Sequence, residues 1–361
     1  MLNGLRIIDF SVYLPGPYAT MRLADLGAEV IKVEPPSGDP ARTTGKYLYS
    51  ANNRNKKSIC LNLKDAKEKQ IALDLICQAD VVIESFRPGV MEKLGLGYES
   101  IKIRKPDIIY CSLSGYGQQS SLSTLGSHDL NYMSLSGVLS QLKEEKGKPI
   151  HPSMTFADLI GGIAANESIL AAIYHRKETG EGQYLDLSLV DVMISLMSNH
   201  VLIEKQTGYG YGVDLLAGTI LNYAIYETSD HRFVSLAALE QKFWENFCFA
   251  VNKESWVSAY FSKTEHSNPV YNEVKDLFKS RTIHEWTEFG LEIDCCLTPI
   301  LETSELAEYS YIAEKGLVAD QHGIRQVKTQ SNSPFSHFTK PPELNEHRDE
   351  ILNGVVNPQS Y

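Results

Sequence analysis

The stretch from Leu5 to Val33, LRIIDFSVYLPGPYATMRLADLGAEVIKV, decides the predicted fold. Leu5–Phe10 is a short apolar run of the kind that a buried parallel strand shows. A helical pattern follows Pro15-Gly16-Pro17 and stops at Gly27, a residue type that commonly ends helices. Val30–Val33 predicts the next strand, so the stretch forms one β-α-β unit.

The same alternation continues over the first 200 residues. Apolar runs at Val81–Ile83, Ile108–Leu113 and Tyr184–Leu187 predict three more strands. Helical spacing marks three further segments, which are Lys64–Gln78, Asp158–Lys177 and Val190–Leu202. This rhythm predicts an α/β fold in which helices cover both faces of a parallel sheet.

The composition changes after Gly208–Gly212, which alternates glycine with tyrosine. Tyr223–Ala237 predicts a β-hairpin with Ser229 and Asp230 at its turn. Helices are predicted around Glu240–Val251 and Ser304–Lys315. We therefore expect a large domain over 1–205, completed by an extended tail from about 320–361. A linker at 206–219 would lead to a smaller α+β domain at 220–319.

Composition and charge exclude several classes of protein. Of the 361 residues, 43% are hydrophobic and 22% are charged, so a sizeable core can form. The formal net charge of −11 argues against a nucleic-acid partner. Six cysteines without a C-x-x-C pair indicate buried thiols in a reducing compartment. We see neither a signal peptide nor the run of roughly 18 apolar residues that a membrane span needs, and expect a cytoplasmic protein.

Familiar catalytic motifs are missing from the sequence. No G-x-G-x-x-G follows a strand, and no Walker A, G-x-S-x-G or H-E-x-x-H motif occurs. Nicotinamide-dependent, nucleotide-hydrolysing, serine-hydrolase and zinc-protease functions therefore lose support. No spacing of ligands suggests a metal site.

Four ionisable residues stand in unusual settings. His128 and Asp129 open a predicted helix in GSHDLNYMSLSG, Asp158 lies in FADLIGGIAANESIL, and Glu240 closes the apolar run SLAALE. Residues at a helix start face unpaired backbone N–H groups and the positive end of the helix dipole. Taken alone, a structural histidine, a helix N-cap at Asp158 and a surface helix at Glu240 remain the competing interpretations.

Three longer stretches resemble the family III CoA-transferases, and the resemblance covers nearly the whole chain. They are GLRIIDFSVYLPGPYATMRLADLGAEVIKVEPPSGDPAR (4–42), FRPGVMEKLGLGYE (86–99) and ILAAIYHRKETGEGQYLDLSLVDVM (169–193). Within that family, SHDLNYMSLSG, FADLIGG and AALEQKFW are similar to segments of the α-methylacyl-CoA racemases. Ser127 stands where that racemase motif usually has glycine. The resemblance implies a Rossmann-like large domain plus a small domain, in an interlocked homodimer.

The resemblance also implies roles for the ionisable residues. His128 and Asp158 would act as two bases on opposite faces of the carbon beside the thioester carbonyl. Glu240 would hydrogen-bond His128 and set its tautomer. Backbone N–H groups near Asp129 would receive the enolate oxygen. The substrate would be an acyl-CoA thioester, with no cofactor beyond coenzyme A itself.

Coenzyme A is heavily phosphorylated, so a chain of net charge −11 needs a local basic cluster to bind it. The stretch where the resemblance puts coenzyme A supplies candidates, and Tyr132 is expected to line the same pocket. The predicted binding residues are Arg54, Lys56, Lys64, Arg87, Lys93 and Tyr132. The competing interpretation of these cations is an ordinary solvated surface.

Two other functions remain open at this point. In a CoA-transferase of the same family, the aspartate matching Asp158 is a nucleophile that carries the acyl group covalently. His128 discriminates between the two enzymes, because a two-base mechanism needs it and a covalent relay does not. A non-catalytic acyl-CoA binder would keep the cations but would not need the ionisable residues. The acyl chain itself is not indicated.

Overall fold

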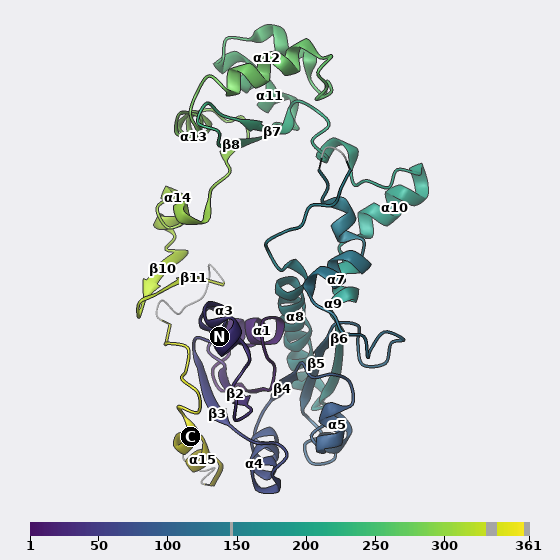
Figure 1. Cartoon of the computed structure of the whole chain (residues 1–361), viewed down its shortest axis with the longest axis vertical. Helices are drawn as coiled ribbons and strands as arrows, with labels where there is room; N and C mark the ends of the chain where they lie inside the picture. The colour runs from purple at the N-terminus through teal and green to yellow at the C-terminus, as the bar shows by residue number, and fades with distance from the viewer. Residues whose placement is uncertain (145–146, 330–337, 357–361) are drawn as a thin grey trace. The chain divides into compact units, whose positions relative to one another are not determined.

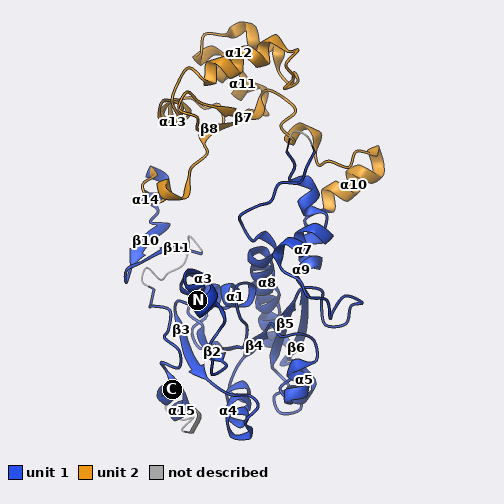
Figure 2. Ribbon diagram, in the orientation of Figure 1, with its two compact units in different colours: residues 1–197, 310–361 blue, residues 198–309 orange. Residues whose placement is uncertain are grey.

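A computed structural model of the chain describes residues 1–144, 147–329 and 338–356. It divides into two units, one of residues 1–197 with 310–361 and one of residues 198–309 (Figure 2). The sequence led us to expect the large domain to run to 205 and the small domain to end at 319. The division by contacts places these boundaries at 197 and 309 instead.

The first unit is built on a six-stranded parallel sheet with the order β3-β2-β1-β4-β5-β6 (Figure 1). Its strands are β1 (Arg6–Asp9), β2 (Glu29–Glu34), β3 (Lys56–Cys60), β4 (Val81–Glu84), β5 (Ile109–Ser114) and β6 (Gln183–Ser188). The predicted parallel sheet is therefore confirmed. The sequence analysis missed β3, which forms one edge of the sheet.

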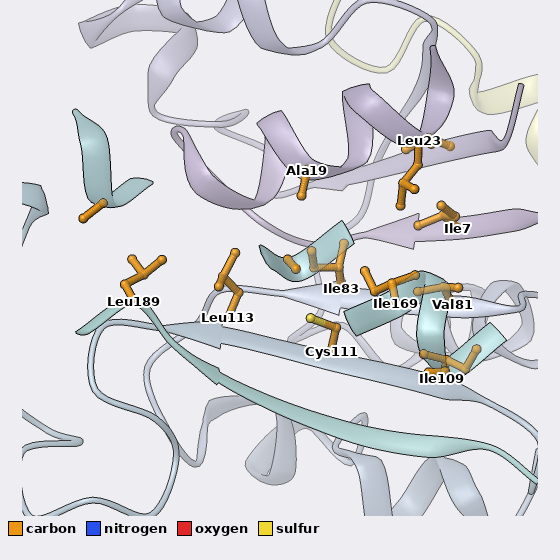
Figure 3. Packing of buried hydrophobic residues seen from close by; sticks show 14 of the residues in the cluster. Ile7, Ala19, Leu23, Val81, Ile83, Ile109, Cys111, Leu113, Ile169 and Leu189 are labelled. Atoms are coloured by element: carbon orange, nitrogen blue, oxygen red, sulfur yellow. The ribbon is translucent and has the colours of Figure 1, made fainter. Parts of the chain in front are cut away.

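Helices cover both faces of this sheet, as predicted. The helices that pack on one face are α1 (Pro15–Ala24), α7 (Asp129–Leu135), α8 (Phe156–Thr179) and α9 (Leu189–Ser195). The helices that pack on the other face are α4 (Ala66–Cys77), α5 (Val90–Leu94), α6 (Tyr98–Lys102) and α15 (Arg348–Val356). Successive strand residues point to opposite faces, so Ile7 joins the first core cluster and Ile8 the second. Figure 3 shows the first cluster, in which Ala19 and Leu23 of α1 face strand residues such as Ile83.

Helix α8 is the central helix of the first cluster. An added Cβ at Gly162 would lie only 2.8 Å from the Pro15 carbonyl oxygen, so glycine permits the close approach of α8 to the start of α1. By length and composition α8 is also the one helix in the described part of the chain that could cross a membrane. In this structure it packs against α1, α9, β5 and β6, which fits the core helix of a globular unit.

Short elements complete the first unit. They are α2 (Ala41–Thr44), α3 (Lys46–Asn52), η1 (Val138–Gln141), α14 (Ser310–Glu314), β10 (Val318–Gln321) and β11 (Ile324–Val327). The tail, expected to be extended, contains the antiparallel β10–β11 hairpin and helix α15. Helix α15 packs against α4 and β3 and so returns the end of the chain to the sheet.

The second unit has its own core around an antiparallel sheet of order β7-β8-β9. Its elements are α10 (Ser198–Thr207), η2 (Asp214–Leu216), β7 (Tyr223–Glu227), β8 (Phe233–Ala237), α11 (Gln241–Ala250), η3 (Glu254–Ala259), α12 (Pro269–Phe278), α13 (Ile283–Glu292), β9 (Leu297–Pro299) and η4 (Thr303–Glu305). The predicted hairpin at 223–237 is present as β7 and β8.

Two predicted helices are wrong in extent. The single helix expected over 190–202 is split into α9 and α10, which belong to different units. The helix expected over 304–315 is replaced by η4 and the separate short helix α14. Here the Glu305 carboxylate turns back to accept the backbone N–H of Glu302 at 2.6 Å and also binds Arg232, which holds the segment in a tight turn.

Candidate active site

A cavity of about 770 Å³ lies at the carboxyl ends of the central strands of the first unit. Strands β1 and β4 are neighbours, but the chain leaves β1 toward β2 and leaves β4 toward β5 on the other side. Such a reversal of strand order opens a crevice at the sheet edge, where open α/β sheets bind ligands. The walls come from the segments that follow β1 (12–15), β4 (85–88) and the end of β5 (113–116).

Buried ionic groups hold the segment after β1 in place. The Lys32 ammonium donates to the Ser11 carbonyl at 2.7 Å and pairs with Asp39 at 2.9 Å. Asp39 in turn accepts the backbone N–H of Tyr13 at 3.2 Å, where the chain takes the left-handed conformation. Because Lys32 and Asp39 are both fully buried, their bonds to Ser11 and Tyr13 hold this wall of the cavity in a defined conformation.

His128 lines the cavity at the start of α7. It is the N-cap residue of the helix, and its own backbone N–H donates to the Asn131 side chain at 3.1 Å. The local sequence therefore folds as expected, with the helix beginning at Asp129. The imidazole is exposed rather than packed in a core, so the purely structural interpretation of this histidine loses support.

Asp158 lines the same cavity from the first turn of α8. The N-cap of that helix is Thr155, so the alternative role of Asp158 as N-cap is wrong. Burial, together with charge repulsion from the nearby Asp129 carboxylate, raises the pKa of the Asp158 carboxyl to about 7. The structure thus brings His128 and Asp158 to one cavity, with an aspartate able to hold or release a proton near neutral pH.

Asp129 links the two helices that carry these residues. Its Oδ1 accepts the backbone N–H of Asp158 at 3.0 Å, and the Ala157 N–H also hydrogen-bonds to it. Burial raises the pKa of Asp129 as well. The side chain therefore satisfies the start of α8 from the start of α7 and fixes the spacing of His128 and Asp158. Reception of the enolate oxygen by nearby backbone N–H groups stays a prediction.

Tyr132 is a buried residue of α7 that forms part of the cavity wall, and its role in binding coenzyme A stays a prediction. Its hydroxyl accepts from Ser127 Oγ at 3.1 Å and donates to the Ser127 carbonyl at 3.2 Å. The serine that replaces the motif's glycine is thus used to hold the tyrosine. An added Cβ at Gly115 would lie 2.5 Å from the Tyr132 ring, so only glycine leaves room for this contact.

Glu240 belongs to the second unit and directly precedes α11. Its side chain is exposed and does not cap the helix, although its backbone carbonyl accepts from Phe243 N–H at 3.0 Å. This position agrees with the competing interpretation, in which Glu240 lies at the start of a surface helix. The expected hydrogen bond from Glu240 to His128 remains a prediction.

The expected coenzyme A residues fall into three groups. Arg87 lies on the cavity wall and is exposed, which suits a phosphate-binding cation. Lys64 and Lys93 are exposed but do not line the cavity, so their binding role stays a prediction. Arg54 and Lys56 need correction, because both side chains are buried.

The buried cations are occupied by other parts of the first unit. The Arg54 guanidinium binds Asp25 through two nitrogens, at 3.0 and 2.6 Å, and stacks on Phe338. The Lys56 ammonium pairs with Asp9 at 3.1 Å and donates to the Pro17 carbonyl at 2.9 Å. These two residues therefore stabilise the fold of the sheet edge and the tail instead of presenting charge to a phosphate.

Several wall residues were not singled out from the sequence. They include Tyr13, Phe86, Ser114, Tyr116, Ser153 and Thr155. Phe86 and Tyr116 come two residues after β4 and β5, and Tyr13 lies in the segment that follows β1, so the switch-point rule would have selected these three had the strand order been known. The described residues contain no group of three His, Cys, Asp or Glu side chains that could hold a metal ion.

Comparisons with known proteins identify the family of this chain. The model of a family described as CoA-transferase family III matches residues 2–348. A human Alpha-methylacyl-CoA racemase is 31% identical over 359 residues, covering 97% of this chain and 92% of its own. A human Succinyl-CoA:glutarate CoA-transferase is 31% identical over 380 residues, covering 98% and 86%. A solved CAIB/BAIF family protein from Brucella suis superposes with a TM-score of 0.86 at 25% identity, covering 98% and 99%. The chain belongs to CoA-transferase family III.

Proposed function

We propose that this protein is an acyl-CoA racemase that inverts the carbon beside the thioester carbonyl. The observation that carries the proposal is the presence of His128 and Asp158 on the wall of one cavity at the strand switch point. An imidazole and a carboxyl group at one cavity can take a proton from one face of a carbon and return it from the other. A 2-methylacyl-CoA is the substrate class that the racemase relatives suggest.

The reaction needs no oxidant, reductant or second substrate. One base takes the α-proton, and the electron pair of the broken C–H bond moves into the C–C bond as the carbonyl π pair moves to oxygen. The resulting enolate is stabilised by hydrogen-bond donors, for which we propose backbone N–H groups at the start of α7. The protonated second group then donates its proton to the opposite face of the carbon. A pKa near 7 suits Asp158 to both roles.

The remaining residues would bind and orient. We propose that Arg87, with Lys64 and Lys93, interacts with the phosphates of coenzyme A, since all three side chains are exposed. Glu240 would orient His128, as the resemblance implies. The exposed apolar side chains of Leu135, Ile163 and Tyr174 in the first unit support the further proposal that the chain forms an interlocked homodimer.

A CoA-transferase is the second candidate, because relatives bearing that name are as similar to the chain as the racemases are. In that reaction an Asp158 oxygen would bond to the acyl carbon while the coenzyme A thiolate leaves. This attack requires the ionised carboxylate, whereas burial favours the protonated form of Asp158 at pH values below about 7. A two-base mechanism uses both the protonated and the ionised form of Asp158, and it also uses His128 on the same cavity wall.

Exchange of the α-hydrogen in D₂O separates the candidates. The protein is incubated with a 2-methylacyl-CoA in the absence of any acceptor acid, and deuterium at the α-carbon is followed by mass spectrometry. A racemase incorporates one deuterium and equilibrates the two epimers. A transferase shows turnover only after an acceptor acid is added, and a binding protein shows neither reaction; either result would refute the proposal.

A further inference from the structure

Glu84 is a buried carboxyl group at the end of β4 that the proposed reaction does not use. Glu84 is only 3% exposed. The next residue along the chain, Ser85, is the first of the 85–88 segment that lines the cavity. A carboxylate buried in this way is costly unless hydrogen-bond donors surround it.

The donors come from two directions. Glu84 Oε2 accepts the backbone N–H of Phe86 at 2.8 Å, which closes a tight local contact at the start of the segment. The side chain of Ser112 on β5 also hydrogen-bonds to the carboxyl group. The Tyr184 hydroxyl on β6 donates to Ser112 Oγ at 3.3 Å. Glu84 therefore ties the 85–88 segment to the two strands beyond β4.

The 85–88 segment carries the cation of the cavity. Arg87 is the only lysine or arginine among the described residues that line it. An added Cβ at Gly126 would lie 3.7 Å from Arg87 Nη2, so the guanidinium lies beside the segment that leads into His128. A change in the path of residues 85–88 would move this charge relative to the cavity.

We infer that Glu84 is a positioning residue for acyl-CoA binding, which holds the 85–88 segment through the Phe86 N–H so that Arg87 faces the ligand. The inference rests on the proposed function, in which the cavity receives a coenzyme A thioester. Burial is the largest cause that raises the pKa of Glu84 to about 7, and the Glu92 and Asp186 carboxylates contribute to the same rise. Ionisation of this group thus works against stability, which fits a residue with a role other than stabilising the fold.

Two substitutions of similar size distinguish the hydrogen-bond acceptor of Glu84 from its negative charge. In Glu84→Gln the amide oxygen still accepts the Phe86 N–H, and Ser112 can turn to accept from the amide nitrogen. In Glu84→Met the thioether is only a weak acceptor, so the Phe86 N–H loses its partner while the volume is kept. Binding of free coenzyme A by calorimetry and the steady-state constants KM and kcat are then measured for both variants.

We expect Glu84→Met to raise Kd for coenzyme A and KM about tenfold, the effect of one lost buried hydrogen bond, with kcat within about twofold of the wild type. Glu84→Gln is expected to stay within about twofold in all three. Cys111→Ala on the adjacent strand β5 is the matched control, because Cys111 belongs to the core cluster and does not line the cavity. It should lower stability and leave KM unchanged.

The outcomes distinguish this inference from the proposed function. Wild-type affinity in a folded Glu84→Met protein would overturn the inference alone. A fall in kcat with unchanged KM would also overturn it, because that pattern reports a loss of folded enzyme. Failure of the wild-type protein to bind coenzyme A would contradict the proposed function and this inference with it. Binding of coenzyme A without α-hydrogen exchange or transfer would contradict the proposed reaction. The inference about Glu84 would then be decided by the calorimetric Kd of the Glu84→Met variant.

Discussion

Glu84→Gln is expected to stabilise the protein against unfolding above neutral pH. Burial moves the pKa of Glu84 from an ordinary value of 4.5 to about 7 in the folded state. At about 1.36 kcal/mol for each pKa unit, the difference corresponds to about 3 kcal/mol of unfolding free energy. Because the residue is 3% exposed, solvent screening does not reduce this figure much. It is an upper bound, since relaxation around the charge lowers the cost.

The sign follows from proton binding. A carboxyl group with a raised pKa binds its proton more tightly in the folded state than in the unfolded state. As the pH rises from about 4.5 to about 7, the unfolded chain releases the proton first, and the wild-type protein loses stability. Above that range the loss is constant. Glutamine does not titrate, so the variant lacks this loss.

Urea unfolding of both proteins at about pH 4.5 and about pH 8 measures the effect. The stability of Glu84→Gln relative to the wild type should be higher at the alkaline pH by as much as about 3 kcal/mol. Glu99→Gln, which replaces an exposed carboxylate on α6, is the control and should show no such difference. A Glu84→Gln effect of equal size at both pH values would refute the reasoning.

Three further substitutions test other parts of the structure. Asp129→Asn removes the negative charge that raises the pKa of Asp158, so the acidic limb of the pH profile of kcat/KM should move to lower pH. Lys56→Met leaves Asp9 buried without its cation and should lower the unfolding free energy by about 3–5 kcal/mol in thermal or urea unfolding. Gly115→Ala places a methyl group against the Tyr132 ring and forces that ring out of the cavity wall. This variant should lower kcat/KM by about tenfold to a hundredfold.

Each of these predictions has a matched comparison. Lys67→Met removes an exposed lysine of α4 and should leave stability unchanged, whereas an equal loss from both lysine variants would contradict the buried pair. Gly210→Ala adds a methyl group to open space and should not affect kcat/KM. An acidic limb that stays in place in Asp129→Asn would show that this carboxylate does not act on Asp158.

Much of the sheet could be predicted because its strands have a local signature. Short apolar runs such as Val81–Ile83 carry that signature in their own residues, since both faces of a parallel strand are buried. Strand β3 lacks it, because it begins with Lys56 and Lys57. The charge of the buried Lys56 is balanced by Asp9, a partner 47 residues earlier in the chain, and no local pattern reveals that ion pair.

In the candidate site, too, local features could be predicted from the sequence and long-range contacts could not. Helix starts are local, so the positions of His128 and Asp158 near the beginning of two helices could be predicted from sequence. The meeting of those helices at one cavity depends on strand order and on the Asp129 contact, which are long-range properties. The mistaken roles of Arg54 and Lys56 have the same origin, because a basic sequence cluster does not show which cations have buried carboxylate partners.

The measurement that tests the two-base claim most directly is α-hydrogen exchange from each separated epimer of a 2-methylacyl-CoA in D₂O, with His128→Ala and Asp158→Asn. Each substitution removes the base on one face, so His128→Ala should lose exchange from one epimer and Asp158→Asn from the other, each by about a hundredfold or more. Loss from the same epimer in both variants, or undiminished exchange from both epimers in either variant, would contradict the account.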